Sequence, residues 1–474
     1  MKEKLDLYID GQFIEAKNYV PLYSPYSNEK IADVAFANEE ETDLAISAAA
    51  RASKMMAKMP AYERADILEN VVTLLKEKAD ECARLIATES AKPITAAKGE
   101  VARTIMTYKF AAEEARRITG ETIPMDAAPG GEGRIAFTIR EPIGVIGAIT
   151  PFNFPMNLVA HKVGPAIAAG NAIVLKPAEQ TPLSALFLAE IFQKAGLPAG
   201  VLNIIPGHGH IAGDRLVQDE RVKGITFTGS PPVGKLIKGK AGLKKVTLEL
   251  GSNSALIVDD GVDVESLIDR AVFGAFANAG QVCISVQRIY VHENLFEQFV
   301  KSFSRKAETL VCGDPLDEKT DISALIRAKE ADRAIQWIDE AVKQGAKIIT
   351  GAKREGNILY PTVLTDVSSD AKISCQEAFA PLVMINKVKS VEEAVKLVND
   401  SKYGLQAGIY TNSVHTAFEA ASNLQVGGVM INDIPTFRVD HMPYGGVKES
   451  GYGREGLKYA IEEMTELKLI CFKK

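Results

Sequence analysis

Two short apolar stretches, Ile143-Gly-Val-Ile-Gly-Ala-Ile-Thr150 and Ala172-Ile-Val-Leu-Lys176, decide the fold class. Each predicts a strand, and the segment between them predicts a helix from about Asn157 to Ala168. Apolar strands that alternate with helices of this length predict an α/β fold with a parallel, doubly wound sheet. Ligands of such sheets bind at the carboxyl ends of the strands, so polar residues there are the first candidates for a functional site.

The same alternation continues in two series, the second of which begins near Ala255. Further strands are expected at 201–205, 224–228, 246–250, 255–258, 287–292, 381–388, 407–411 and 427–432. The predicted helix starts are Thr181 as cap with Pro182 in the first turn, Asp263, Asn294, and a capping box of Ser390 with Glu393. The first hundred residues are predicted to be mostly helical, with periodic stretches at 39–54, 61–88 and 96–119.

Length and charge limit the class of protein. At 474 residues the chain exceeds a single hydrophobic core, so about two or three domains are expected. The net charge of −6 argues against a nucleic-acid-binding surface. The lysine-rich stretch 235–245 is interpreted as a solvated helix face, and attraction of a phosphate beside a cofactor is the alternative.

The apolar runs and the cysteines indicate the compartment. The amino-terminal stretch contains no signal peptide, and no apolar run is long enough to span a membrane. The five cysteines are odd in number and lack the spacing of metal ligands or of a disulfide framework. We therefore expect a cytoplasmic protein without a metal site.

Three side chains beside glycine or proline turns are candidates for catalysis. The thiol of Cys283, in Asn278-Ala-Gly-Gln-Val-Cys283, can attack an electrophilic carbon. Glu249 ends a predicted strand before Gly251 and can activate water, and Asn153 can donate to an oxyanion. The alternatives are an inert buried thiol, a salt-bridged glutamate and an ordinary asparagine turn.

Two glycine-rich stretches follow predicted strands and could receive a pyrophosphate. Gly207-His-Gly209-His-Ile-Ala-Gly213 has one residue too many for the standard dinucleotide fingerprint. Phe227-Thr-Gly229-Ser230-Pro-Pro-Val-Gly234 leads into a helix whose free backbone N–H groups could bind a phosphate. Lys176-Pro-Ala-Glu179 offers a cation and an acid to a ribose. Each stretch could also be a simple tight turn.

Taken together, these stretches resemble the NAD(P)-dependent aldehyde dehydrogenase superfamily over essentially the whole chain. The resemblance rests on the order and intervals of Pro151-Phe-Asn153-Phe-Pro, Lys176-Pro-Ala-Glu179, Phe227-Thr-Gly-Ser230, Leu248-Glu249-Leu-Gly, Gly280-Gln-Val-Cys283, Gln376-Glu377-Ala-Phe379-Ala-Pro381 and Pro443-Tyr-Gly-Gly-Val-Lys-Glu-Ser-Gly.

The resemblance implies roles for individual residues. Cys283 would be the nucleophile, Asn153 and the Cys283 N–H would stabilise the oxyanion of a thiohemiacetal, and Glu249 would activate the water that hydrolyses a thioester. The residues expected at the cofactor are Thr150, Pro151, Phe152, Lys176, Glu179, Gly209, Gly213, Phe227, Gly229, Ser230, Val233, Leu250, Gly251, Glu377 and Phe379. An acid at Glu179 favours NAD, with NADP as the alternative.

The substrate is expected to be a small aldehyde. Arg103, His161 and Arg438, together with the stretch around Cys283, resemble the branch that oxidises lactaldehyde and small anionic aldehydes. We hypothesise that these three residues form a cationic mouth for an anionic group, and ion pairing within the protein is the alternative.

The resemblance also implies a division of the chain. Residues 1–117 and 140–250 would form the dinucleotide-binding domain and residues 251–442 the catalytic domain. Residues 118–139 and 456–474 would form an oligomerisation element with a free strand edge, so a homodimer or homotetramer is expected.

Two other functions stay open at this point. One is an enzyme of the same fold that passes the acyl group to coenzyme A or phosphate, and Glu249 argues against it because the acylating members lack a glutamate there. The other is a non-catalytic binding or structural protein, against which Cys283, Glu249 and Asn153 argue.

Overall fold

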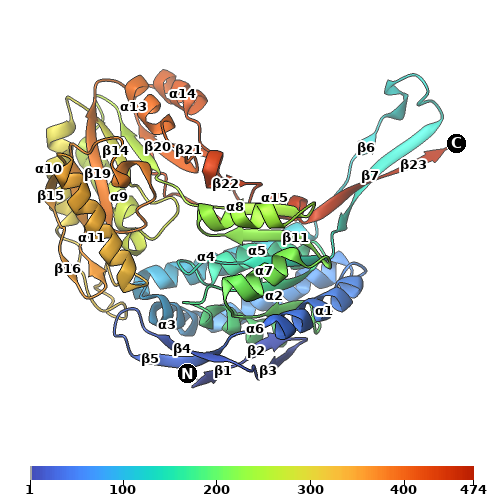
Figure 1. Cartoon of the computed structure of the whole chain (residues 1–474). Coiled ribbons are helices and arrows are strands. Elements are labelled where there is room, and N and C mark those ends of the chain that lie inside the picture. The colour runs from blue at the N-terminus through green and yellow to red at the C-terminus, as the bar shows by residue number, and fades with distance from the viewer. Residues whose placement is uncertain (1–2) are drawn as a thin grey trace.

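The computed structural model describes residues 3–474, and over that range two sheet-centred bodies and a thin projecting arm are visible (Figure 1). The first body contains an eight-stranded sheet of order β22-β12-β11-β8-β9-β10-β2-β3. Its strands β8 to β12 pair in parallel, which confirms the predicted α/β class. The bounds are β2 Leu7–Ile9, β3 Gln12–Ile14, β8 Val145–Ile149, β9 Ala172–Lys176, β10 Leu202–Ile204, β11 Val222–Thr228, β12 Lys245–Glu249 and β22 Gly451–Tyr452.

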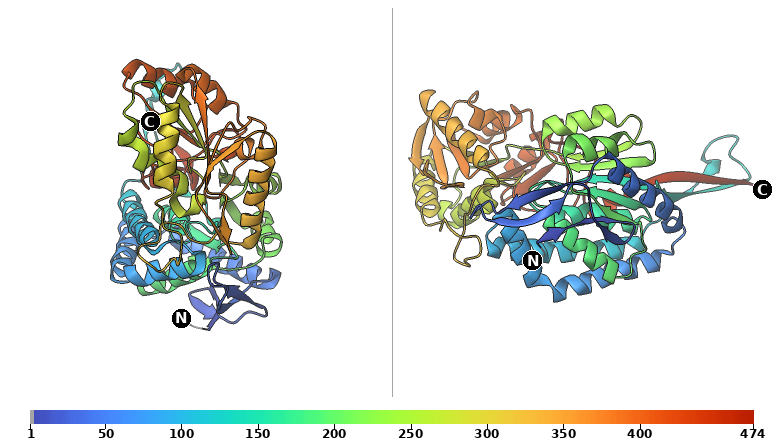
Figure 2. Two further views of the ribbon diagram at one scale, coloured as in Figure 1. Left: turned by 90° about the vertical axis from the view of Figure 1, so that its left-hand side faces the viewer. Right: turned by 60° about the horizontal axis from the view of Figure 1, so that its bottom comes forward.

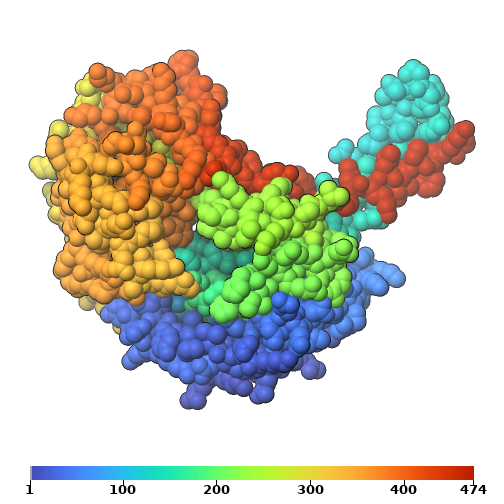
Figure 3. Space-filling model, viewed as in Figure 1, coloured from blue at the N-terminus to red at the C-terminus, as the bar shows by residue number. Residues whose placement is uncertain are grey.

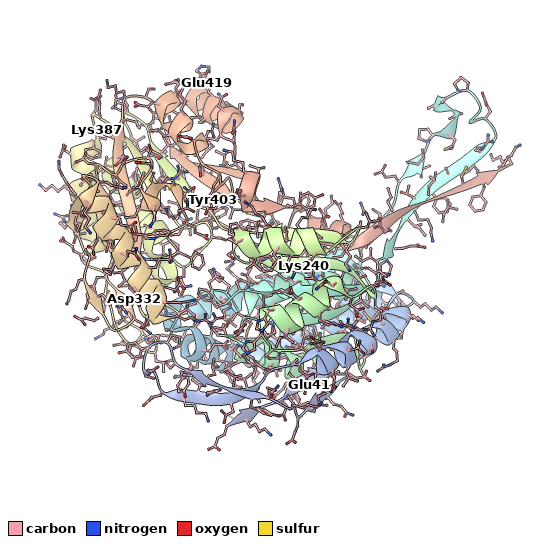
Figure 4. The ribbon with its side chains drawn as sticks, in the orientation of Figure 1. Glu41, Lys240, Asp332, Lys387, Tyr403 and Glu419 are labelled. Carbon is pink, nitrogen blue, oxygen red and sulfur yellow. The ribbon has the colours of Figure 1, made fainter. Side chains whose placement is uncertain are left out.

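Helices surround this sheet. The side chains of β8 and β9 are buried, as expected for strands covered on both faces. The start of α1 is a reciprocal capping box, in which Asn38 accepts from the Glu41 N–H while the Glu41 carboxylate accepts from the Asn38 N–H (Glu41 is labelled in Figure 4). The helices are α1 Glu39–Met56, α2 Ala61–Glu77, α3 Ala79–Ser90, α4 Ile94–Ala115, α5 Asn157–Ala168, α6 Leu183–Lys194, the π-helical turn η2 Gly209–Gly213, α7 Asp214–Gln218, α8 Pro231–Lys240 and α15 Leu457–Glu463.

The second body contains a seven-stranded sheet of order β15-β18-β19-β14-β13-β20-β21. All its pairings are parallel except that of β15 with β18. The strands are β13 Ala255–Val258, β14 Arg288–His292, β15 Lys347–Thr350, β18 Thr362–Thr365, β19 Leu382–Val388, β20 Gln406–Tyr410 and β21 Gly428–Ile431, with the hairpin β16 Arg354–Glu355 and β17 Ile358–Leu359 beside them. The helical segments are α9 Val264–Phe276, η3 Ala277–Gly280, α10 Phe296–Ala307, α11 Ala328–Lys343, α12 Lys372–Cys375, α13 Val391–Asn399, α14 Val414–Asn423 and η4 Lys448–Ser450.

The arm is a three-stranded antiparallel sheet that extends away from both bodies (Figures 1 and 2). It comprises β6 Thr122–Ile123, the turn η1 Met125–Ala127, β7 Arg134–Pro142 and β23 Thr465–Lys473. Strand β23 pairs with β7 continuously from Thr465↔Pro142 to Lys473↔Arg134. Helix α15, which precedes β23, packs against α4 and α5 and so lies in the first body rather than in the arm.

The amino-terminal third differs from the prediction. Besides β2 and β3, the first 35 residues form a small sheet of β1 Lys4–Leu5, β4 Tyr19–Tyr23 and β5 Lys30–Ala35, seen along the bottom of Figure 1. Several of these strands have only two or three residues, too few to show an alternating pattern. The helix predicted over 61–88 is interrupted at Lys78, between α2 and α3.

Two predicted caps are wrong, because the helix starts are stabilised from elsewhere or not capped by a side chain. Thr181 does not cap α6; its buried hydroxyl has no partner among the described residues. The Glu89 carboxylate instead accepts from the Leu183 and Ser184 N–H groups at 2.7 and 3.0 Å. Asn294 bonds Asp260 rather than the start of α10. The caps at Asp263 and Ser390 are confirmed, although Glu393 accepts from Lys389 and not from Ser390.

Candidate active site

The two bodies enclose a cavity of about 1120 Å³, and the surface is hollowed between α8 and the second body (Figure 3). Cys283, Glu249 and Asn153 all line this cavity, although they come from separate segments of the chain. Over residues 3–474 no group of histidine, cysteine and acidic side chains is arranged to hold a metal ion.

The turn before Cys283 has an unusual backbone. Asn278, Ala279 and Gly280 all have positive φ, at 50°, 54° and 69°. A left-handed conformation costs an alanine about 1 kcal/mol, so tertiary contacts must hold this turn. A Cβ on Gly280 would lie 2.1 Å from the Ala380 carbonyl oxygen, so only glycine fits. This close approach packs the turn against the segment that carries Phe379.

Asn153 reaches the same turn. Its side-chain amide donates to the Gln281 carbonyl at 2.8 Å, and the Asn278 amide donates to the Asn153 carbonyl at 3.3 Å. The side chain is buried and faces the cavity. An amide has two N–H donors, so one remains for a ligand oxygen.

Within residues 3–474 the Cys283 sulfur has one polar partner, the Tyr444 hydroxyl at 2.9 Å. The Arg438 guanidinium stacks over the Tyr444 ring at 3.6 Å. Burial raises the pKa of the Cys283 thiol to about 11, and both the Tyr444 hydrogen bond and the charge of Arg438 act in the opposite direction. The thiol is therefore mostly protonated at neutral pH.

Glu249 is buried at the end of β12, and its two carboxylate oxygens have no hydrogen-bond partner in the described part of the chain. Burial raises its pKa well above the ordinary value, with the charge of Glu455 as the next cause. A Cβ on Gly445 would lie 2.9 Å from Glu249 Oε1, so a glycine leaves room for this side chain. A buried carboxyl without partners is costly for stability and is typical of functional sites.

Two carboxylates hold the residues predicted to form a cationic mouth. Asp440 accepts from Arg103 Nη2 at 2.7 Å and lies 2.8 Å from His161 Nε2. Glu455 accepts from Arg438 Nη2 and from Lys162 Nζ, each at 3.0 Å.

The cluster therefore contains three cations and two carboxylates, which leaves one positive charge if His161 is neutral. Burial, followed by the charge of Arg438, lowers the pKa of His161, which favours the neutral form. Arg103 and Arg438 line the cavity, whereas His161 does not. Arg438 Nε is buried without a partner among residues 3–474. The structure thus brings the three predicted residues together, but as an ion-paired cluster.

The residues expected at a cofactor fall into two groups. The cavity lining includes Pro151, Phe152, Gly229, Ser230, Leu250, Gly251, Glu377 and Phe379. The others, Thr150, Lys176, Glu179, Gly209, Gly213, Phe227 and Val233, lie outside that lining, on or next to β8, β9, β11, η2 and α8.

Several features of this region fit a dinucleotide. A Cβ on Gly229 would lie 2.5 Å from the Phe227 ring, and one on Gly251 would lie 2.3 Å from Glu377. Both glycines therefore leave room in the cavity wall that a larger residue would fill. The buried Thr228 hydroxyl has no partner within the described range. Glu179 accepts from the Gly209 N–H at 3.3 Å and lies 3.3 Å from His208 Nδ1. Lys176 Nζ, in contrast, is occupied by the carbonyls of Pro177 and Gly207.

The start of α8 offers fewer donors than predicted. Its first two residues, Pro231 and Pro232, have no N–H, and the Gly234 N–H donates to the Ser230 carbonyl. Val233 and the Ser230 hydroxyl remain as the donors of that turn.

The lysine-rich stretch 235–245 has the contacts of a solvated helix face. Lys240, labelled in Figure 4, pairs with Asp214, and Lys235 pairs with Glu449, each at 2.7 Å. Lys238 lies over the Tyr452 ring.

Sequence reasoning missed the partners of these residues. The motif that begins at Pro443 contains Tyr444 but predicts no role for it, and no pattern predicts Asp440, Glu455 or Lys162 as site residues. A lysine in the mainly apolar helix α5, next to His161, was a usable signal for Lys162, which is buried and bonds the Thr226 hydroxyl at 3.0 Å. Nothing local distinguishes Glu455.

Comparison with known proteins identifies the class. The model of the aldehyde dehydrogenase family matches residues 13–470. The chain is 49% identical over 464 residues to 3-sulfolactaldehyde dehydrogenase of Priestia megaterium, covering 98% of this chain and 97% of the relative. It is 42% identical over 472 residues to lactaldehyde dehydrogenase of Methanocaldococcus jannaschii, covering 99% and 100%.

A solved structure agrees with these matches. The glyceraldehyde-3-phosphate dehydrogenase of Methanocaldococcus jannaschii, complexed with NADP, superposes with a TM-score of 0.93 at 42% identity, covering 97% of this chain and 100% of that one. This chain belongs to the aldehyde dehydrogenase family. It is an oxidoreductase that acts on aldehydes with NAD or NADP.

Proposed function

We propose that this enzyme oxidises a small aldehyde bearing an anionic group to the carboxylic acid, with Cys283 as nucleophile and Glu249 as base. The observation that carries the proposal is the convergence of a thiol, an unpartnered buried carboxyl and an amide donor on one cavity. No hydrogen bond to another protein group occupies Glu249 within the described chain, which leaves the carboxylate available to a water molecule.

In the first step, the Cys283 thiol releases its proton to solvent and the sulfur attacks the aldehyde carbon. The C–S bond forms as the carbonyl π electrons move to oxygen, and Asn153 and the Cys283 N–H donate hydrogen bonds to that oxygen. A nicotinamide cofactor held beside Cys283 would supply the hydride acceptor, and the acyl group would then remain on Cys283 as a thioester. Phe379 and Glu377, which line the cavity, would hold the nicotinamide end, and Ser230 and Glu179 would hold the pyrophosphate and the adenosine ribose.

In the second step, Glu249 takes a proton from water while the water oxygen attacks the thioester carbon. The C–S bond breaks as the Cys283 thiolate leaves, the carboxylic acid is released, and the proton that Glu249 accepted returns to Cys283. Because this step needs only water, it distinguishes the enzyme from an acyltransferase, whose turnover would require coenzyme A or phosphate as acceptor.

The anionic group of the substrate is inferred from the charge balance of the Arg103 cluster. Its cations exceed its carboxylates by one, Arg103 Nη1 has no hydrogen-bond partner within residues 3–474, and Arg438 Nε is buried and unpaired. The 3-sulfolactaldehyde and glyceraldehyde-3-phosphate dehydrogenases carry names of anionic substrates, which agrees with this inference. Lactaldehyde, the substrate named for another relative, is the neutral alternative.

A panel of aldehydes tests the proposal. Aldehydes bearing sulfonate, phosphate or carboxylate are compared with lactaldehyde, with NAD and with NADP, by nicotinamide reduction. We expect higher kcat/KM for an anionic aldehyde, and Arg103→Met should lower it about tenfold or more for that substrate while leaving lactaldehyde nearly unchanged, because a hydrogen bond to a charged group is worth about 1.5–3 kcal/mol. Equal effects on both substrates would contradict the anion site.

We also propose that the enzyme is a cytoplasmic homodimer or homotetramer joined through the arm. In this proposal residues 1–117 and 140–250 form the cofactor domain, and residues 251–442 form the catalytic domain. Exposed apolar residues Phe137, Leu467 and Phe472 on β7 and β23 support the arm as an interface. Among residues 3–474 no helix is both long and apolar enough to cross a membrane. Mass measurement in solution with and without the segment 465–474 tests the assembly.

A further inference from the structure

The Cys283–Tyr444 contact joins two segments that are far apart in the chain. The turn that carries Cys283 follows α9, whereas Tyr444 follows β21 and precedes β22. The two polar atoms are 2.9 Å apart, and both residues line the cavity. No other protein group within residues 3–474 hydrogen-bonds the sulfur, so Tyr444 is its one polar contact in the described chain.

Tyr444 is itself held in place. Its side chain is buried, and the Arg438 guanidinium covers its ring at 3.6 Å. Arg438 in turn donates to Glu455, which also binds Lys162. Gly445, the next residue, has a φ of 157° and no side chain, and the room it leaves is filled by Arg454 and Glu249. The tyrosine hydroxyl therefore has a fixed direction toward the sulfur.

We propose that Tyr444 assists the nucleophile directly: its hydroxyl orients the Cys283 sulfur and donates a hydrogen bond to the thiolate, under the positive charge of the stacked Arg438. This inference rests on the proposed role of Cys283 and adds a residue to it. The thiol releases its proton to solvent, while the tyrosine keeps its own proton.

The charges around the sulfur agree with that assignment. Besides Tyr444, the ionisable groups that act on Cys283 are Arg438, Glu377 and Glu249. Burial raises the pKa of Tyr444 well above its ordinary value, so its oxygen remains a donor at the pH of assay. The two glutamates disfavour a thiolate once ionised, and Tyr444 and Arg438 are the groups that favour it.

The test is Tyr444→Phe in the full-length protein without cofactor, read by alkylation. Iodoacetamide modification of Cys283 is followed by mass spectrometry over a range of pH; the thiolate sulfur bonds to carbon as iodide leaves. A hydrogen bond to a charged group is worth about one pH unit or more, so the half-maximal rate should move to higher pH by about that amount.

The size of the rate change follows from two opposing effects. One pH unit lowers the thiolate fraction about tenfold, and the more basic sulfur regains about threefold in intrinsic reactivity. At neutral pH the variant should therefore react about threefold more slowly. Thiolate absorbance in the ultraviolet, recorded over the same range, should show the same displacement and does not depend on the alkylating reagent.

Tyr108→Phe is the matched control. Tyr108 is also buried, and its hydroxyl has no hydrogen-bond partner within the described part of the chain. It packs against Phe192 and does not line the cavity. This variant should keep the wild-type alkylation profile, and thermal unfolding of both variants checks that they fold.

An unchanged or faster alkylation of Tyr444→Phe would overturn the assignment of Tyr444. Failure of the underlying function has a different signature, because it would leave Cys283→Ser with full turnover. If Cys283→Ser is inactive and Tyr444→Phe alkylates like the wild type, only the role of Tyr444 is lost.

Discussion

The two reactive groups of the cavity are held in opposite ways. Cys283 follows a left-handed turn and packs against a small apolar cluster, and its sulfur bonds the Tyr444 hydroxyl, whose ring Arg438 covers. Glu249 is buried and has no hydrogen bond from another described residue, although the charges of Glu455 and Arg438 act on it. The difference teaches that one cavity can orient a thiol with a hydrogen bond and leave a carboxyl free of one. Burial is the largest cause of the raised pKa of both groups, and at the thiol the Tyr444 hydrogen bond acts against it.

The largest effect is expected at Cys283, the group with a hydrogen bond to Tyr444. In Cys283→Ser the hydroxyl is a far weaker nucleophile than a thiol, so turnover should fall by about 10⁴-fold or more. Steady-state nicotinamide reduction measures this change, and cofactor binding by fluorescence checks that the site is intact. Substantial residual turnover would mean that the contacts around Cys283 are structural.

Glu249→Gln tests the buried carboxyl that has no hydrogen-bond partner within the described chain. Loss of the base should lower kcat by about 10²–10⁴-fold, and the first turnover should still proceed, so a burst of reduced nicotinamide should precede a slow steady state. Stopped-flow absorbance and mass detection of the acylated Cys283 measure it. A loss without a burst would place Glu249 before hydride transfer.

The same variant should not lose stability. Burial raises the pKa of Glu249, so the folded protein binds this proton more tightly than the unfolded chain does. The contribution of Glu249 to the free energy of unfolding therefore declines as the pH rises from its pKa in the unfolded chain toward its pKa in the folded protein. Glutamine removes that decline. Thermal unfolding of Glu249→Gln should match or exceed the wild type, with the difference growing toward alkaline pH.

The pH dependence of kcat/KM tests the ionisation of Cys283 and Glu249 together. With the pKa of Cys283 at about 11 and that of Glu249 raised, both active forms are the deprotonated ones, so the rates rise with pH. We expect kcat/KM to increase up to about tenfold per pH unit above neutral wherever ionisation of the thiol limits the rate. A kcat/KM that falls between neutral and mildly alkaline pH would contradict the prediction that both groups act in their deprotonated forms.

The smallest effect is expected at the adenosine end of the site. Glu179 is partly exposed and close to His208, and its charge would repel a 2′-phosphate. Glu179→Gln should improve kcat/KM for NADP relative to NAD by about fivefold, which corresponds to removing about 1 kcal/mol of repulsion. Parallel kinetics with the two cofactors measure the ratio. An unchanged ratio would show that Glu179 does not set the preference.

Much of the fold could be predicted because the two sheets are mainly parallel and buried. Strand β9, strand β13 and helix α5 have the bounds expected from their apolar runs. The short amino-terminal strands could not be predicted, because two or three residues carry no period. The cap of α6 could not be predicted either, since Glu89 lies far from it in sequence.

Some residues of the candidate site could be predicted from the sequence, and others could not. Glycine and proline turns around Cys283, Glu249 and Asn153 marked residues that the structure brings to one cavity. Their partners Tyr444, Glu455 and Asp440 come from the return of the chain from the second body to the first, and no local pattern relates them to Cys283 or Arg103. Three-dimensional contact was needed to see that the expected cationic mouth is largely neutralised.

Gly280 has a mechanical consequence. Because its backbone abuts the Ala380 carbonyl with no room for one more carbon, a side chain at position 280 would push the Cys283 turn away from the segment bearing Phe379. Any larger residue there would therefore change the spacing between the proposed nucleophile and Phe379. The absence of one methyl group in the sequence fixes how closely these two segments approach.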